Sequence, residues 1–175
     1  MVYVLSYALI VFAVILRLVP HPANFAPIAA LALFGGVYLN RKLAIIIPLA
    51  AMLISDYAIG LYSYKIMLSV YGSFVLVGLI GLWLRNHKSV LNVVGASLLG
   101  SVLFYLITNF AVWAFGTLYP KTLTGLLTSY TMAIPFFRNT ILGDMFYTGL
   151  LFGTYELVRY LATRRAGTYA MPSDS

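Results

Sequence analysis

The chain has 175 residues, of which 62% are hydrophobic and 9% are charged. A soluble domain of this size carries about 25% charged residues, so the composition excludes a conventional water-facing surface. The sequence holds no cysteine, which excludes disulfides, thiolate metal sites and cysteine nucleophiles. The net charge of +7 comes from Lys and Arg in short loops, which indicates membrane orientation rather than nucleic-acid binding.

Six apolar segments follow one another, and we predict an all-α integral membrane protein with six transmembrane helices. A span needs about 20 apolar residues, so the length suits one domain, which we assign to residues 1–167. Residues 168–175 are predicted to form a polar, disordered tail. The N-terminus lacks a charged region and a cleavage site, so the first segment is expected to remain a helix. The predicted spans cover residues 2–19, 25–39, 43–61, 66–84, 90–115 and 134–161.

Two stretches depart from a regular six-span pattern. The segment over 25–39 is shorter than a span and contains Pro27, so we expect it to tilt inside the bundle or to follow a loop that dips into the membrane. The connection over 117–133 is mildly apolar and is predicted to hold a short interfacial helix or a lid.

Lys and Arg divide unequally between the two sets of loops, which predicts a cell-membrane protein with both termini in the cytoplasm. Seven of the 11 lie in the second and fourth connections and near the C-terminus. The minority on the other face comprises Arg17, Lys65, Lys121 and Arg138. Arg17 and Arg138 lie within the ends of predicted spans, and Asp56 and Asp144 belong to the same face. Ionisable groups at that depth are costly unless paired or hydrated, so we expect ion pairs around an outward pocket.

Further polar residues on this face are candidates for ligand binding. Arg17, His21 and Asn24 adjoin a stiff Pro-His-Pro turn. Alternatively, Arg17 extends to the interface and Asn24 stabilises a turn. Asn109 and Trp113 share one helix face. In one interpretation Asn109 donates to a ligand and Trp113 forms an aromatic wall. In the other, Asn109 forms an interhelical hydrogen bond and Trp113 lies at the membrane interface.

Arg138, Asn139 and Asp144 begin the last predicted span. Arg138 is expected to recognise an anion with the help of the positive helix end, to pair with Asp56 or Asp144, or to do both. Lys121 is a further donor in the long connection, or simply a loop lysine.

Enzymatic motifs are absent from the sequence, which has no P-loop, no G-x-S-x-G and no H-E-x-x-H. The two histidines, His21 and His87, are predicted on opposite faces, so we expect no metal site, no cofactor and no enzymatic activity. Glu156 and Arg159 have the spacing of a helix-surface ion pair.

A local pattern over residues 24–60 resembles a known family of transport proteins. It reads Asn-Phe-Ala-Pro-Ile-Ala-Ala, then Gly35-Gly36, then an apolar span that closes on Ser55-Asp56. This pattern, with the chain length and the predicted topology, resembles the substrate-binding S components of energy-coupling-factor vitamin transporters. The Arg-Asn-Thr-x-x-Gly-Asp stretch over 138–144 also resembles a family of uncharacterised bacterial membrane proteins.

The resemblance implies a vitamin pocket near the outer face, a transmembrane scaffold partner and two cytoplasmic ATPases that supply energy. The Ala-x-x-x-Ala docking motif, which that family often carries on the first helix, is matched here only by Ala26 and Ala30. These two alanines suit either partner docking or internal packing.

We therefore expect a component for micronutrient uptake, embedded in the lipid bilayer, that captures an anionic or carbonyl-rich small molecule from outside. The alternatives are a structural or assembly protein whose charges serve packing only, and a lipid-modifying acid–base pair at Asp56 or Asp144. The predicted ligand-binding residues are Arg17, His21, Asn24, Asp56, Asn109, Trp113, Lys121, Arg138, Asn139 and Asp144.

Overall fold

The computed structural model is all-α, as predicted, and it describes residues 2–20 and 22–169. Five of the six helices begin and end close to the expected positions, whereas the last begins 11 residues earlier than predicted. The helices are α1 (Val2–Leu18), α2 (Ile28–Tyr38), α3 (Arg41–Ile59), α4 (Tyr64–Leu84), α5 (Val90–Phe115) and α6 (Leu123–Tyr169).

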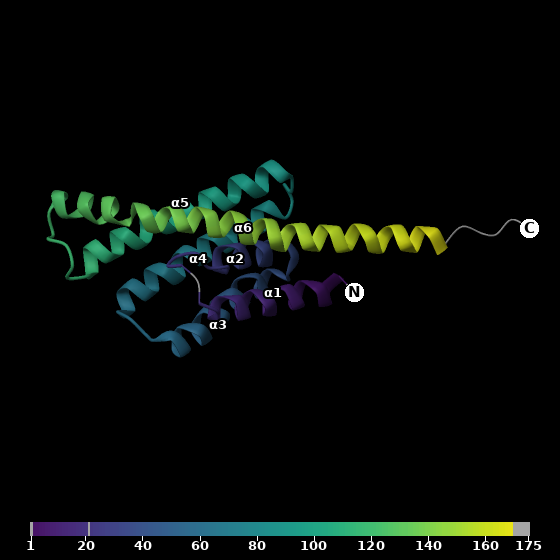
Figure 1. Cartoon of the computed structure of the whole chain (residues 1–175), viewed down its shortest axis with the longest axis horizontal. Helices are drawn as coiled ribbons and strands as arrows, with labels where there is room; N and C mark the ends of the chain where they lie inside the picture. The colour runs from purple at the N-terminus through teal and green to yellow at the C-terminus, as the bar shows by residue number, and fades with distance from the viewer. Residues whose placement is uncertain (1, 21, 170–175) are drawn as a thin grey trace, which may run out of the picture.

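Helix α2 is the buried centre of the bundle. Every residue from Ile28 to Val37 is buried, and α2 packs against every other helix (Figure 1). Its 11 residues extend only about 16 Å at 1.5 Å per residue, well short of a bilayer's hydrocarbon core of about 30 Å. The predicted short segment is therefore an internal helix, and the face that contains Ala30 packs inside the bundle instead of on a partner.

Two glycines bring the backbones of α2 and α4 into direct contact. A Cβ atom added to Gly36 would lie 2.6 Å from the Cα of Gly81, and one added to Gly81 would lie 2.5 Å from the carbonyl oxygen of Leu33. No side chain fits at either position without moving a helix. This close crossing fixes α4 against α2.

Arg85 satisfies the carbonyl groups at the end of α2. Its Nε and Nη2 atoms donate to the carbonyl oxygen of Gly36 at 3.1 and 2.7 Å, and Nη2 also donates to that of Leu39. The last carbonyls of a helix have no partner within the helix, and an unsatisfied one inside a membrane protein costs several kcal/mol. Arg85 therefore allows α2 to end inside the protein.

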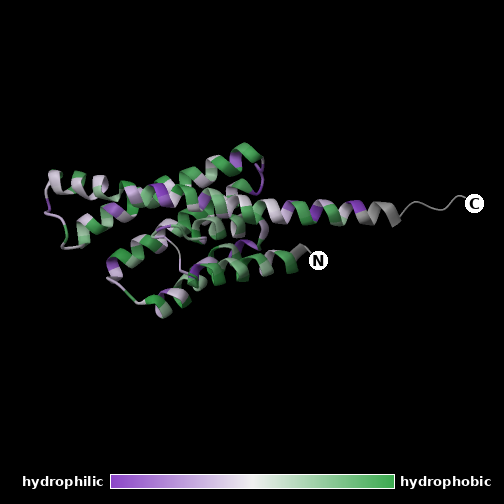
Figure 2. Cartoon of the chain, in the orientation of Figure 1, coloured by the Kyte–Doolittle hydropathy of each residue, from purple (hydrophilic) through white to green (hydrophobic). Residues whose placement is uncertain are grey.

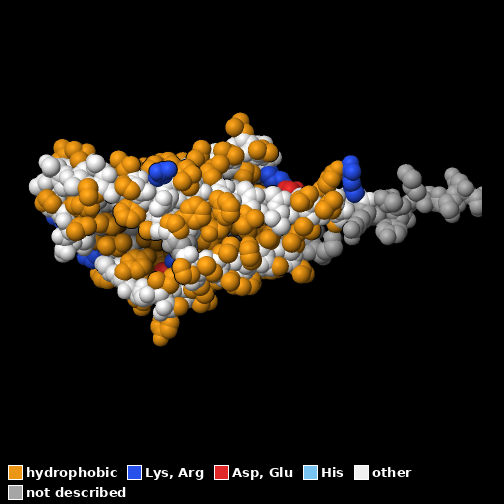
Figure 3. Space-filling model, viewed as in Figure 1, with side chains coloured by type: hydrophobic (Ala, Val, Ile, Leu, Met, Phe, Trp, Pro, Cys, Tyr) orange, Lys and Arg blue, Asp and Glu red, His pale blue; other side chains and the backbone are white. Residues whose placement is uncertain are grey.

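Three of the described helices, α3, α4 and α5, are long and apolar enough to cross a membrane. Two shorter apolar helices cover Val4–Leu18 and Ile28–Tyr38. Hydrophobic positions dominate the helices in Figure 2, and hydrophobic side chains dominate the face drawn in Figure 3. Large apolar side chains such as Val90 and Leu91 are exposed all around the bundle. These features support a helical membrane protein.

Helix α6 corrects the prediction for residues 117–133. It begins at Leu123 and continues through Pro135 for 47 residues, so residues 123–133 form neither a lid nor a separate helix. The early turns of α6 are held along α5, where the hydroxyl of Tyr105 donates to the carbonyl oxygen of Tyr130 at 2.7 Å and that of Tyr130 donates to Leu106 at 2.8 Å.

The C-terminal part of α6 extends beyond the other helices (Figure 1). At 1.5 Å per residue, the 47 residues measure about 70 Å, which is more than twice the hydrocarbon thickness of a bilayer. Thr168 and Tyr169, which we assigned to the tail, are the last residues of this helix. Residues 170–175 lie outside the described part of the chain.

The close crossing of α2 and α4 predicts that alanine at position 81 destabilises the protein. Gly81→Ala should lower the free energy of unfolding by about 1–3 kcal/mol, because the new methyl group meets backbone atoms. Gly72→Ala on the same helix is the matched control, since a Cβ atom there meets nothing within 4 Å. Thermal unfolding in detergent measures both. Equal stability of the two variants would contradict the crossing.

Candidate functional site

A buried ion pair joins the ends of α1 and α3. Nη2 of Arg17 lies 2.5 Å from Oδ1 of Asp56, and Asp56 is only 4% exposed. Nη1 of Arg17 donates to the carbonyl oxygen of Met52 at 3.1 Å and to Oγ of Ser55. The hydroxyl of Tyr71, from α4, donates to the second carboxylate oxygen of Asp56 at 2.9 Å. The predicted pairing of outer-face charges is therefore present here, and protein groups engage both members.

Asp144 has a different environment, although sequence reasoning grouped it with Asp56. It is 3% exposed, and its hydrogen-bond partner is Ser101, whose hydroxyl donates to Oδ2 at 2.6 Å. No ion pair involves Asp144 in the described structure, so its predicted pairing with Arg138 is wrong. Ser101 lies near the midpoint of α5, which places Asp144 deeper than the helix end where we expected it.

A cavity of about 270 Å³ brings three of the predicted residues together, and we name it the Arg17 cavity. All six helices contribute to its wall, and its polar lining includes Arg17, Asn24, Thr140 and Asp144. The rest of the wall is apolar or aromatic and comprises Ala26, Ile28, Ala29, Met52, Ile59, Tyr62, Val70, Phe74 and Phe104.

A second cavity of about 280 Å³ adjoins the first, and we name it the Asn109 cavity. The two share Asn24, Val70, Phe104 and Thr140. The amide nitrogen of Asn109 donates to the carbonyl oxygen of Tyr105 at 2.8 Å, one turn earlier on α5. The predicted interhelical hydrogen bond is therefore made within one helix, and Asn109 lines the cavity wall.

The connection between α1 and α2 closes over both cavities. Asn24 adopts a left-handed backbone conformation with φ of 62°, which Asn tolerates better than most residues. The side-chain nitrogen of Asn139 donates to the carbonyl oxygen of Ala23 at 3.1 Å. A Cβ atom added to Gly143 would lie 3.0 Å from the Cα of Phe25. Asn139 therefore positions this connection on α6 instead of lining a cavity.

Trp113 and Lys121 stabilise the turn between α5 and α6 and line neither cavity. The indole nitrogen of Trp113 donates to the carbonyl oxygen of Pro120 at 3.0 Å. The ammonium group of Lys121 donates to the carbonyl oxygens of Trp113 and Gly116, the latter at 2.5 Å. A cation at the carbonyl end of a helix is a common stabilising arrangement. Their predicted part in ligand binding therefore has no support from the geometry.

The remaining predicted residues are Arg138 and His21. Arg138 is exposed and lines neither cavity. His21 lies outside the described residues.

Several residues of the site escaped sequence reasoning because they are ordinary members of apolar spans. Tyr71 and Ser101 bind the two carboxylates, and Phe74 and Phe104 lie with ring centroids 5.2 Å apart in the cavity wall. The only signal for Ser101 was a hydroxyl inside an apolar helix. Tyr62 also faces the cavity from the connection after α3, and partial burial, with the Asp56 carboxylate nearby, raises its pKa.

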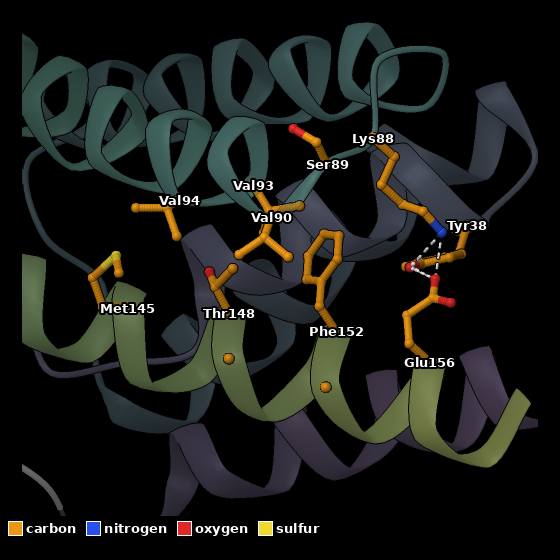
Figure 4. Close-up of a pocket in the computed structure, with 12 residues that line it drawn as sticks. Tyr38, Lys88, Ser89, Val90, Val93, Val94, Met145, Thr148, Phe152 and Glu156 are labelled. Atoms are coloured by element: carbon orange, nitrogen blue, oxygen red, sulfur yellow. Dashed lines mark hydrogen bonds and ion pairs between the residues drawn. The ribbon is translucent and has the colours of Figure 1, made fainter. Parts of the chain in front are cut away.

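A separate groove of about 470 Å³ lies at the other end of α5, and we name it the Tyr38 groove. Figure 4 shows Lys88 and Tyr38 pointing toward Glu156 at its end, with Val93 and Phe152 along its wall. The hydroxyl of Tyr38 donates to Glu156 at 2.5 Å, and Lys88 forms an ion pair with the same oxygen. The predicted pair of Glu156 and Arg159 is confirmed at 3.7 Å, as a minor part of this cluster.

Residues 2–166 match the family of unknown function DUF6580. The chain belongs to this family. No curated protein and no solved structure matches it. Within the described residues, no three His, Asp or Glu side chains gather where they could hold a metal ion. Membership in this family assigns no ligand and no reaction.

The ion pair predicts strong coupling between positions 17 and 56. Arg17→Met or Asp56→Asn alone should lower the free energy of unfolding by about 3–5 kcal/mol, because each leaves a buried charge without its partner. The loss in the double variant should be smaller than the sum of the two single losses by at least about 1 kcal/mol. Chemical unfolding in detergent measures the cycle. Additive losses would show that the two side chains do not interact.

Proposed function

We propose that the protein is a membrane-embedded component that binds a small micronutrient from outside and passes it on for uptake into the cell. The observation that carries the proposal is the Arg17 cavity, where Arg17 and Asn24, from the N-terminal part of the chain, meet Asp144 from the last helix. Ligand sites are typically apolar hollows with a few polar groups at fixed positions, and this cavity has that character.

The distribution of charge supports an outward-facing cavity. The connections nearest the two cavities carry few Lys and Arg. At the opposite end of the bundle, Arg41 and Lys42 begin α3, and Arg85 and Lys88 lie in the connection between α4 and α5. Short loops rich in Lys and Arg face the cytoplasm. In the proposed topology both termini are cytoplasmic and α1 and α6 complete the set of full-length spans. Inside the bundle, α2 and its flanking residues carry the chain back from the end with the Arg17 cavity to the end with the Tyr38 groove.

Energy for uptake would come from separate partners, because the sequence has no P-loop. A transmembrane scaffold with cytoplasmic ATPases, as the family resemblance implies, is the proposed arrangement. Such a scaffold would not bind through Ala30, which is 1% exposed within the bundle. Its docking surface must therefore use other helix faces.

One observation favours the alternative of a structural membrane protein. The guanidinium of Arg17 donates to Asp56, Ser55 and Met52, so its charge is balanced without a ligand. The same observation weakens the expectation of an anionic ligand. The structural alternative does not explain Asp144, which is buried beside a cavity without a cationic partner.

Filling the cavities tests the proposal directly. Val70 lines both cavities, so Val70→Phe should reduce retention of a bound vitamin by at least about ten-fold, the effect of 1.4 kcal/mol in binding. Leu68→Phe, on the exposed face of the same helix, is the matched control and should bind as the unmodified chain does.

The measurement is native mass spectrometry of the purified protein with a panel of vitamins. A retained vitamin that is lost in Val70→Phe and kept in Leu68→Phe supports uptake binding. If the unmodified chain retains nothing, or if both variants retain the vitamin equally, the cavity is not the binding site.

A further inference from the structure

Around the Arg17 cavity, the described residues include two carboxyl groups and one cation. Arg17 and Asp56 neutralise each other through direct contact at 2.5 Å. Asp144 also lines the cavity, and Arg17 is the only Lys or Arg among the described residues of its wall. The site therefore contains one carboxylate more than it has cations.

The hydroxyl of Ser101 is a hydrogen-bond donor to Asp144. The hydroxyl of Ser101 can donate its single hydrogen either to Asp144 at 2.6 Å or to the carbonyl oxygen of Ser97 at 3.1 Å. One hydroxyl does not compensate for burying a full negative charge, so a buried carboxyl group stays neutral unless a cation lies nearby. A cation that enters the cavity would allow Asp144 to ionise and pair with it.

The rest of the wall suits a cation that carries an apolar body. Phe74 and Phe104 present a pair of aromatic rings, and Val70 and Met52 add apolar surface. An ammonium group near an aromatic ring is attracted by the negative face of that ring. A site with one carboxylate, two phenyl rings and apolar walls has the chemistry that recognises an organic cation.

We propose that the ligand of the Arg17 cavity carries a protonated amine, which binds the carboxylate of Asp144 while its apolar body lies against Phe74 and Phe104. This inference rests on the proposed function and replaces the anionic ligand expected from the sequence. Arg17 then acts as a structural cation, already neutralised, and Asp144 is the residue that selects the charge of the ligand.

Three probes with the same phenyl body and different charges test this inference on the full chain in detergent. They are phenethylamine, which is cationic, 2-phenylethanol, which is neutral, and 3-phenylpropionate, which is anionic. Isothermal titration calorimetry should show that the amine binds at least ten-fold more tightly than either of the others. Equal binding of the three, or preference for the anion, overturns the inference.

Variants then assign the preference to one residue. Asp144→Asn should remove the preference for the amine, whereas Glu156→Gln, the same chemical change on the same helix in the Tyr38 groove, should keep it. If the amine binds Asp144→Asn as tightly as the unmodified chain, the inference is wrong. If Asp144→Asn does not fold, Ser101→Ala should still prefer the amine, and loss of that preference would contradict direct binding by Asp144.

The vitamin panel separates this inference from the proposed function. If no probe binds but a cationic vitamin is retained and then lost in Asp144→Asn, the inference stands. Retention of an anionic or neutral vitamin alone leaves the proposed function standing and overturns the protonated amine. If neither a probe nor a vitamin binds, both fail.

Discussion

The architecture depends on one short helix that is buried on every side. An 11-residue helix cannot cross a bilayer, so α2 is stable only where other helices surround it and supply partners for its ends. Gly36 and Gly81 let α4 approach to backbone contact, and Arg85 satisfies the terminal carbonyls. The two ends of α2 then define the polar regions, since Ile28 lines the Arg17 cavity and Tyr38 belongs to the groove at the opposite end.

The two buried carboxylates show how similar residues take different roles. Asp56 has the guanidinium of Arg17 and the phenol of Tyr71 as direct partners, so removing either partner is expected mainly to lower the stability of the protein. Asp144 has a hydroxyl partner and lines a cavity, and in the proposed role its carboxyl group binds the ligand. The structural and the binding interpretations of the outer charges are therefore compatible, with each applying to a different aspartate.

Hydropathy alone located the helices, because five of six begin and end within a few residues of the apolar segments. The error at α6 came from Pro135. Proline favours the first turn of a helix, but here contacts between Tyr130 and α5 hold the preceding turns in place and the helix continues through it. Whether a helix continues through a proline depends here on contacts between residues far apart in the sequence, and a local sequence pattern does not contain that information.

The site was predictable only where charge made a residue conspicuous. Arg17 and Asp56 stood out as costly groups in apolar spans, and they pair as expected. The partner of Asp144 was not predictable, because Ser101 is 43 positions away and its hydroxyl carries no charge. Trp113 and Lys121 were placed in the site by their type, yet they stabilise a turn. The residues of the site lie deeper in the bundle than those of the turn, and that depth is set by how the helices pack.

The claim that the cavities open to the outside is tested most directly by the accessibility of two introduced thiols. The chain has no cysteine of its own, so Ala23→Cys beside the cavities and Asn86→Cys at the opposite end would each carry a single thiol. Both positions are exposed. An outward cavity predicts that a membrane-impermeant maleimide labels Ala23→Cys in intact cells and labels Asn86→Cys only after permeabilisation. Labelling of Asn86→Cys alone in intact cells would show that the cavities face the cytoplasm and would contradict capture of a ligand from outside.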